Sequence, residues 1–364
     1  MVKRERMTDN LTLNVALLRR KVPNLTAAAK EAGLRPATVS NLCTGKIPVG
    51  RAEVRTLVSL AELAGCRLDD LIIRGGQTKM LETGIKVIDV FAPVVRGGTV
   101  GLVAKPGMGQ LVVLTELFLR LKQTGFTPVF WRPARDVVGM EEVISEAAAV
   151  CDSCEECFQA ILQAEEHGTA VLAADRSYVL FGELGKLRGM LAEARVTDLT
   201  VFLIDVSGVA TEEIVPYGPL DTLWQFDFVL SSKRYYPAID PVASTATLLE
   251  DAHFENRHFT VQQKAKKLLR RYRELAQWLE ASEQAAVPPE ETETFVRGRR
   301  LELYLTQPFY IAEPVTKLAG VWVNAADSLE HVSRIVEGKT DGLDPQLLFY
   351  IGGLPDTVPT GEMG

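Results

Sequence analysis

The clearest pattern of apolar and polar positions lies in the middle of the chain, between residues 81 and 121. Thr99 to Val103 is an apolar run of strand length, Lys105 to Gly109 is a glycine-rich turn, and an apolar-periodic helix starts at about Gln110. Further apolar runs predict strands at Thr127–Trp131, Ala170–Ala174 and Leu199–Ile204, with a helix at about Phe181–Ala194. Strands that alternate with helices are typical of a parallel sheet. The pattern therefore predicts an α/β domain over residues 76–254.

Helical periodicity dominates both ends of the chain. Residues 1–75 predict an all-α domain, with helices at Leu11–Lys21, Thr26–Ala32, Pro36–Cys43, Ala52–Ala64 and Leu68–Ile72. One small core is expected there, from Ala28, Ala29, Leu34, Val39, Leu42, Leu57, Leu60, Leu63 and Leu71. Residues 255–355 predict a C-terminal helical domain, with helices at Val261–Ala281, Phe295–Leu305, Ser328–Glu337 and Pro345–Tyr350. Residues 356–364 are expected to form a disordered tail.

The composition is that of an ordinary globular protein, with 364 residues, 47% hydrophobic and 24% charged. No apolar run reaches the roughly 18 residues of a membrane span, because Glu116 and Arg120 interrupt the best candidate. The N-terminus lacks the apolar segment of a signal peptide. The five cysteines favour reduced thiols in a cytoplasmic protein. We therefore expect a cytoplasmic location and no membrane partner.

Charge is divided unevenly along the chain. Residues 1–75 carry 13 Lys/Arg and 7 Asp/Glu, a balance of +6, so the rest of a chain whose net charge is −7 carries −13. A basic N-terminal module attached to an acidic body indicates that residues 1–75 bind a polyanion.

The glycine-rich turn has the layout of a phosphate-cradling loop, in which backbone N–H groups meet an anion at a helix N-terminus. Such sites also use a Lys that neutralises phosphates and a Ser or Thr that ligates magnesium. Those two positions hold Gln110 and Leu111, and the first glycine of the motif is Ala104. The backbone layout of a nucleotide site is therefore present, but the side chains that would bind phosphate and magnesium are not. We expect no cofactor beyond weak or vestigial nucleotide binding.

Five sequence blocks carry a resemblance to the catalytic (beta) subunit of the rotary ATP synthases. They are LETGIKVID with APVVRGG and the loop, YYPAIDPVAST, QQKAKKLLRRYRELAQ, YLTQPFYIAEPVT and IVEGKTDGLDPQLLFYIGG, in the family's order over residues 78–355. The resemblance implies a RecA-like P-loop fold, a nucleotide site at the seam of a six-membered ring, and a helical C-terminal region. Only about 30 residues separate Asp205 from YYPAIDP, which implies that inter-subunit elements of the family are missing, so a dimer is an alternative to a hexamer.

The resemblance also assigns site residues. The degenerate nucleotide site would comprise Lys105, Gly107, Gly109 and Gln110 of the loop, Asp205 at the magnesium position, and Tyr236, Tyr304 and Phe309 around the adenine. Arg135 falls at the position of the Glu that orients the attacking water, and a cation cannot serve there. A capping role for Asp205 and a core role for the aromatics remain alternatives. No catalytic residue is expected, and the domain is predicted to be a pseudo-ATPase.

The N-terminal pattern resembles the Cro/repressor-type helix-turn-helix, through AxxxGLxxxTVSNLxxGK in residues 29–46. Gly33 would supply a positive φ in the turn, Pro36 would begin the second helix, and Thr26 would cap the first. The resemblance places Arg35, Ala37, Thr38 and Asn41 at base edges and Thr26, Lys46, Arg51 and the arm residues Lys3, Arg4 and Arg6 at phosphates. A four-helix interaction domain that never touches DNA is the alternative.

Two further features leave more than one interpretation open. Cys151, Cys154 and Cys157 lack an evident fourth ligand for a metal, and structural or free thiols are favoured. The surface of the long helix is expected to carry Lys264, Lys266, Lys267, Arg270 and Arg271, which either touch DNA or form a solvated face.

Taken together, the sequence predicts a DNA-binding transcriptional regulator whose partners are double-stranded DNA and copies of itself. An NTP-dependent ring motor on DNA and a non-enzymatic assembly protein are the alternatives.

Overall fold

The computed structural model describes residues 11–22, 25–43, 47–74, 80–166, 168–213, 217–250, 256–281 and 286–355. The chain divides into two compact units. The first contains residues 1–79 and 247–259, and the second contains residues 80–246 and 260–364. The arm residues Lys3, Arg4 and Arg6, the linker Gly75–Lys79, Lys46 and the tail after Pro355 lie outside the described residues.

The first unit is mostly helical. Its helices are α1 (Val15–Lys21), α2 (Leu25–Glu31), α3 (Pro36–Cys43), α4 (Val54–Ala64) and α5 (Leu68–Leu71), with the 3-10 turns η1 (Val49–Arg51) and η3 (Thr247–Glu250). The expectation that Leu11–Leu13 begins a helix is wrong. These residues form strand β1, which pairs antiparallel with β2 (Ile72–Arg74), and the Asn14 side chain then accepts a hydrogen bond from Leu17 N to start α1.

The predicted core of this unit is confirmed. Ala29, Val39, Leu42, Leu57, Leu60 and Leu71 are buried in one cluster, and Ala28, Leu34 and Leu63 pack against it half-buried. Gly33 has φ of 73° and Pro36 begins α3, both as expected. Thr26 is the second residue of α2 rather than its cap, so that expectation is wrong.

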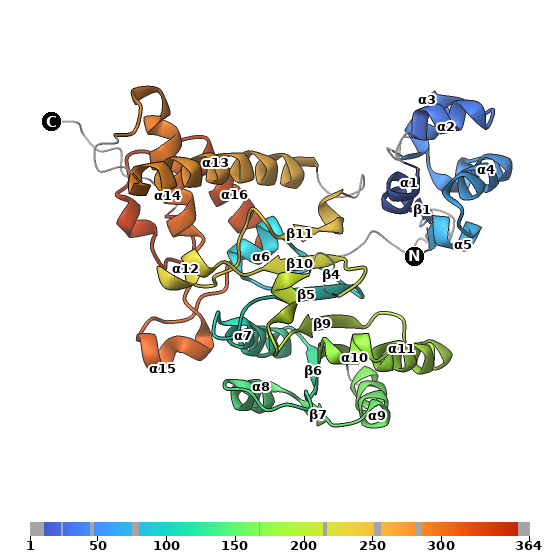
Figure 1. Ribbon diagram of the computed structural model, residues 1–364, viewed down its shortest axis with the longest axis horizontal. Coiled ribbons are helices and arrows are strands. Elements are labelled where there is room, and N and C mark those ends of the chain that lie inside the picture. The colour runs from blue at the N-terminus through green and yellow to red at the C-terminus, as the bar shows by residue number, and fades with distance from the viewer. Residues whose placement is uncertain are drawn as a thin grey trace, which may run out of the picture. The chain divides into compact units, whose positions relative to one another are not determined.

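The second unit is built on a seven-stranded, mostly parallel sheet in the order β11-β10-β5-β9-β8-β6-β7 (Figure 1). The strands are β5 (Thr99–Val103), β6 (Phe126–Trp131), β7 (Ala149–Cys151), β8 (Thr169–Asp175), β9 (Thr200–Ile204), β10 (Thr222–Gln225) and β11 (Thr245–Ala246). Only β11 runs antiparallel to its neighbour. The predicted α/β class is confirmed for this unit, and the predicted strands agree with the observed ones to within one residue.

Helices cover both faces of the sheet. Alternate residues of each strand point to opposite faces, so each face contributes its own apolar side chains to a core beneath the helices. Val100, Leu102 and Phe130 pack with α7 (Gln110–Gln123) and α8 (Met140–Glu146) in one cluster. Val129 and Trp131 face the other way, toward α9 (Cys154–Glu165) and α11 (Glu183–Glu193). Figure 1 shows α7 and α8 on one side of the strands and α9 and α11 on the other. Short elements complete this part, namely α10 (Ser177–Leu180), α12 (Phe228–Ser232) and η2 (Val209–Glu212).

A helical C-terminal region packs on the first of these cores. It contains α13 (Asn256–Ala281), α14 (Thr292–Tyr304), α15 (Glu313–Thr316) and α16 (Ala325–Val336), with 3-10 turns η4 (Pro289–Glu291), η5 (Tyr310–Ala312) and η6 (Pro345–Leu348). The expected helix at Pro345–Tyr350 is thus a short 3-10 turn. The strands β3 (Met80–Leu81) and β4 (Val94–Val95) and helix α6 (Lys86–Phe91) lead into the sheet. None of the described helices is long and apolar enough to cross a lipid bilayer.

The surface expected on α13 needs one correction. Lys264, Lys267, Arg270 and Arg271 are exposed, but Lys266 is buried and its Nζ donates to the Ser244 carbonyl at 2.7 Å. The expectation of an exposed Lys266 is therefore wrong. A lysine can bury its methylene stem when its ammonium finds a partner, and here the Ser244 carbonyl is that partner.

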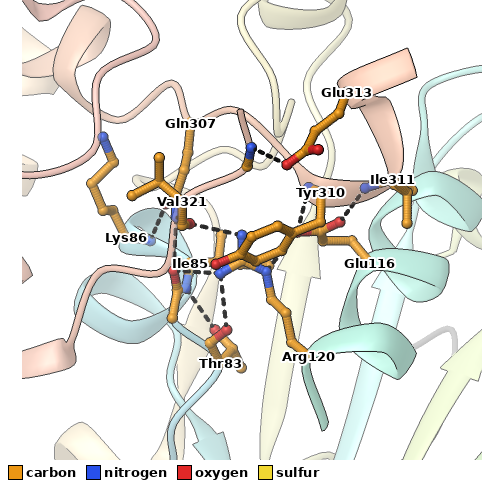
Figure 2. Close-up of polar contacts among 12 residues, drawn as sticks. Thr83, Ile85, Lys86, Glu116, Arg120, Gln307, Tyr310, Ile311, Glu313 and Val321 are labelled. Carbon is orange, nitrogen blue, oxygen red and sulfur yellow. Dashed lines mark hydrogen bonds and ion pairs between the residues drawn. The ribbon is translucent and has the colours of Figure 1, made fainter. Parts of the chain in front are cut away.

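A buried ion pair in α7 joins the sheet helices to the C-terminal region (Figure 2). Arg120 Nε lies 2.6 Å from Glu116 Oε1, and both side chains are fully buried. Arg120 also donates to the carbonyls of Gly84 at 2.8 Å and Val321 at 2.9 Å. Glu116 accepts from the backbone N–H groups of Tyr310 and Ile311, both at 3.1 Å. One pair therefore ties three distant segments of the second unit together.

Gln307 and Asp89 extend this polar cluster. The Gln307 side chain donates to Gly84 O at 2.7 Å and Val321 O at 2.6 Å, and it accepts from Lys86 N at 2.9 Å. Asp89 accepts from Thr83 and Gly84. Burial raises the pKa of the Asp89 carboxyl to about 7, against these hydrogen bonds, which lower it. The cluster is satisfied mainly by backbone groups, so its geometry fixes the path of the chain.

Arg120→Met should destabilise the protein strongly, because it leaves the Glu116 carboxylate buried without a cation. Removing one partner of a buried pair costs about 3–5 kcal/mol. We expect a loss of that size in the free energy of unfolding measured with urea. Lys186→Gln is the matched control, since the Lys186 and Glu155 side chains are 57% and 66% exposed, and a pair of this kind contributes at most about 1 kcal/mol. Equal losses in the two variants would contradict the assignment.

Candidate functional site

The glycine loop lies at the carboxyl edge of the parallel sheet, where ligands of open α/β sheets bind. It connects β5, which lies between β10 and β9, to the N-terminus of α7. Gly107 and Gly109 have φ of 87° and 91°, a conformation that other residues rarely adopt. Lys105 and Gly107 are exposed and Gly109 is half-buried. The predicted strand, loop and helix are therefore all in place.

Gln110 does not extend from the loop as a phosphate-binding Lys would. It is 5% exposed, and its Nε2 donates to the Asp205 backbone carbonyl at 3.1 Å. Its Oε1 is buried and has no hydrogen-bond partner among the described residues. The side chain thus bridges α7 to the end of the neighbouring strand.

Leu111 fills the position of the magnesium-ligating hydroxyl with an apolar side chain. It is 8% exposed and belongs to the larger hydrophobic cluster. Its Cδ1 lies 3.5 Å from the point where a Cβ on Gly139 would stand, so Leu111 packs against the turn before α8. No oxygen ligand is offered at this position.

Asp205 follows β9 at the same edge and is occupied by its own turn. Its Oδ1 accepts from Ser207 N at 2.9 Å and from the Ser207 hydroxyl, and its Oδ2 accepts from Ala210 N at 2.6 Å. Burial acts to raise the pKa of Asp205, but these hydrogen bonds outweigh it and hold the pKa below its ordinary value. The carboxylate is charged and caps the turn into η2, in line with the capping alternative. Ser207 was missed by sequence reasoning, although a serine two residues after an aspartate is a known turn signal.

The loop is held closely against this turn. A Cβ on Gly208, which has φ of 79°, would lie 2.5 Å from Pro106 Cδ. Only glycine therefore allows the turn after β9 to approach the loop. On another side, Tyr236 Cε1 lies 3.7 Å from the position of a Cβ on Gly109. Tyr236 is 37% exposed, so its ring borders the loop and remains open to solvent.

The other two aromatics assigned to an adenine pocket lie in the core. Tyr304 is fully buried, its hydroxyl is 2.9 Å from His331 Nδ1, and the Lys86 ammonium lies 4.2 Å from its ring centroid. Phe309 is 4% exposed and packs 5.8 Å from the Arg120 guanidinium. The structure thus brings Tyr236 to the loop and leaves Tyr304 and Phe309 in the interior.

The region after β6 presents exposed charges. Arg135 and Asp136 are exposed, as are Glu141 and Glu142 on the first turn of α8. Glu141 and Glu142 therefore lie in solvent rather than in the site. Activation of a water molecule requires an acidic side chain oriented by hydrogen bonds. Arg135 is a cation in an exposed loop, so it does not meet this requirement.

In the first unit, α2 and α3 are joined by a tight turn at Gly33. The Leu34 N–H donates to Ala29 O at 2.8 Å, which closes the end of α2. Arg35 precedes α3 and is exposed, as are Ala37 on α3, Thr26 on α2 and Arg51 on η1, whereas Thr38 and Asn41 are half-buried. Val39 and Leu42 point inward. Arg35 just before α3 and Thr38 and Asn41 on it are thus at least partly accessible, while Lys46 lies outside the described residues.

The three clustered cysteines are buried in the second hydrophobic core. Cys151 ends β7, and Cys154 and Cys157 lie on α9, whose N-cap Ser153 accepts from Glu156 N at 3.2 Å. The hydrogen bond with the Cys151 thiol, together with burial, raises the pKa of the Cys157 thiol, and burial raises that of Cys154. No group of three or more His, Cys, Asp or Glu in the described part of the chain is arranged to hold a metal ion. The thiols serve as packing groups in this arrangement.

Compared with known protein families, the chain matches no family model.

Proposed function

We propose that this chain is a DNA-binding protein of the transcriptional-regulator type, with a helix-turn-helix in residues 11–74 and an inactive nucleotide-loop domain in residues 80–355. The α2–α3 pair carries the proposal. Its turn has the positive φ that the motif needs at Gly33, its inner side is apolar, and its outer side offers Arg35, Thr38 and Asn41. The excess of six positive charges in residues 1–75 gives such a surface an attraction for phosphates.

We further propose that the second unit is a RecA-like P-loop domain of the rotary ATP synthase beta-subunit type. Its parallel sheet, its glycine loop after β5 and the five sequence blocks support this assignment. The proposed role is oligomerisation or the sensing of a ligand. The expected cytoplasmic location stays a prediction.

The purified protein should release no phosphate from ATP or GTP in the presence of magnesium. Gln110 supplies no cation, Leu111 supplies no magnesium ligand, and Arg135 cannot orient a water molecule. The Gln110 bond to Asp205 O and the burial of Leu111 support this expectation. Phosphate release that needs magnesium and disappears in Asp205→Ala would show a working ATPase and favour a ring motor on DNA.

DNA binding should depend on the outer side of α3. In the intact chain, Arg35→Ala or Asn41→Ala should weaken binding to a selected duplex site by about 1–3 kcal/mol, the value of one good base contact. Sites can be selected from a random duplex library, and affinity measured by fluorescence anisotropy.

The matched control for this experiment is Arg55→Ala, which removes an exposed arginine from α4 in the same unit. It should leave site preference unchanged. If the wild-type chain ignores duplex DNA even at low salt, the first unit is an interaction module and the chain is an assembly protein.

The chain should form a homo-oligomer, a hexamer or a dimer, through residues 80–355. A single helix-turn-helix reads few base pairs, so such modules act in pairs about one helical turn apart. Sedimentation velocity at micromolar concentration should give a species larger than the 40.0 kDa monomer. Arg35→Ala should sediment like the wild type, because it leaves the second unit intact. A monomer at every concentration, with and without DNA, would refute this part of the proposal.

A further inference from the structure

Helix α13 begins with an unusual concentration of positive charge. Within the second unit, residues 260–273 of this helix contain six Lys or Arg and no Asp or Glu, in a chain whose net charge is −7. Like charges one turn apart on a helix destabilise it by about 0.2–0.5 kcal/mol per pair. A helix that only needed a solvated surface would mix both signs, so this concentration calls for a separate explanation.

Three of the six have roles inside the fold. Lys266 donates to the Ser244 carbonyl, as described above. Arg271 pairs with Glu274 and Glu291, and Arg273 pairs with Asp240 and Glu302. These contacts attach the helix to the rest of the second unit.

Lys264, Lys267 and Arg270 are different. All three are exposed, and among the described residues none of them makes an ion pair or hydrogen bond that the structure records. Lys264 has a weak electrostatic interaction with Glu337. The pKa of Glu337 is lowered first by hydrogen bonds from Lys339 and Ser333 and to a smaller extent by the charge of Lys264. We call Lys264, Lys267 and Arg270 the α13 basic stripe.

The direction of the stripe is fixed by the opposite face of the helix. Val261, Ala265, Leu269, Tyr272 and Leu275 are all buried, at 8% exposure or less. Residues three apart on an α-helix rise by about 4.5 Å and are rotated by about 60°, so the stripe winds over about 9 Å of the exposed part of α13. Duplex DNA carries one phosphate per about 3.4 Å of axis on each strand, so a row of this length can meet two or three phosphates.

We propose that the α13 basic stripe binds the phosphate backbone of duplex DNA, as a contact additional to α3. This inference rests on the proposed DNA-binding function. Residues 76–364, which include the whole second unit, carry −13 in total, so DNA that touches this part of the chain is repelled except where cations are concentrated. The α13 basic stripe concentrates cations in this way. It would not read the base sequence, because a phosphate contact is independent of sequence.

The test is binding of the intact chain to a random-sequence duplex of about 30 base pairs over a series of KCl concentrations. Each phosphate contact adds about 0.9 to the slope of log affinity against log salt. Lys264→Gln/Lys267→Gln/Arg270→Gln should lower the magnitude of the slope by about 2–3 and weaken binding at least tenfold at about 0.1 M salt.

The matched control is Arg195→Gln/Arg299→Gln/Lys317→Gln, which removes the same charge from three exposed positions outside α13. It should change the slope by less than about 0.5, since charges farther away than the screening length contribute little. Circular dichroism melts of both variants should match the wild type, because the six side chains are exposed.

The outcomes separate the two proposals. If the wild-type chain binds DNA and the α13 variant has the same slope and affinity, the stripe is a solvated surface and this inference is wrong, while the function stands. If the α13 variant and its control weaken binding equally, net charge explains the effect and the inference is wrong. If the wild-type chain binds no duplex DNA, the proposed function itself fails.

Discussion

The buried ion pair between Glu116 and Arg120 is the interaction on which the second unit most depends. Both charges are removed from water completely, which is favourable only when their remaining hydrogen-bonding capacity is satisfied. Here backbone groups of residues 84, 310, 311 and 321 supply that capacity. The pair lies on α7, the same helix whose first residue follows the glycine loop. The loop, the sheet and the C-terminal region are therefore held in one fixed arrangement.

Contacts within the fold explain how the loop can keep its shape without the side chains that bind phosphate and magnesium. Internal contacts hold the backbone, since Gln110 bonds to Asp205 O and Pro106 packs against Gly208. The Asp205 carboxylate is satisfied by its own turn. Charge-assisted hydrogen bonds to a phosphate are worth about 1.5–3 kcal/mol each, and Gln110 and Leu111 offer none. Under the proposed function, the loop is thus a structural connection in an assembly domain.

Much of the fold could be predicted from the sequence, because its signals are local. The alternation of strands and helices, the glycines of the loop and the core of the first unit follow from periodicity and turn chemistry. The strand at Leu11–Leu13 could not be predicted, because a three-residue strand is defined by its partner about 60 residues away, which no local pattern reveals. The burial of Lys266 could not be predicted, because a helical pattern does not show which backbone carbonyl lies close enough to accept from its ammonium, as Ser244 O does.

The candidate site was harder to predict, because it depends on which side chains from distant parts of the sequence lie beside the loop. Tyr236, Tyr304 and Phe309 were grouped by resemblance, yet only Tyr236 borders the loop, and burial separates the other two from solvent. Glu116 and Arg120 were noticed only as interruptions of an apolar run. Their spacing of four residues was itself a signal, since opposite charges at that spacing face each other on a helix.

The distribution of charge gives the two units complementary parts in the proposed function. The first unit is basic overall, whereas the second is acidic and carries on α13 three exposed cations for which the structure records no ion pair among the described residues. Two contacts on one chain reinforce each other, because the first bound contact raises the effective concentration of the second. Base reading can then rest on the few side chains of α3, since affinity comes from phosphates while specificity comes from base edges. Under the proposed function, an acidic body repels DNA wherever cations are not concentrated.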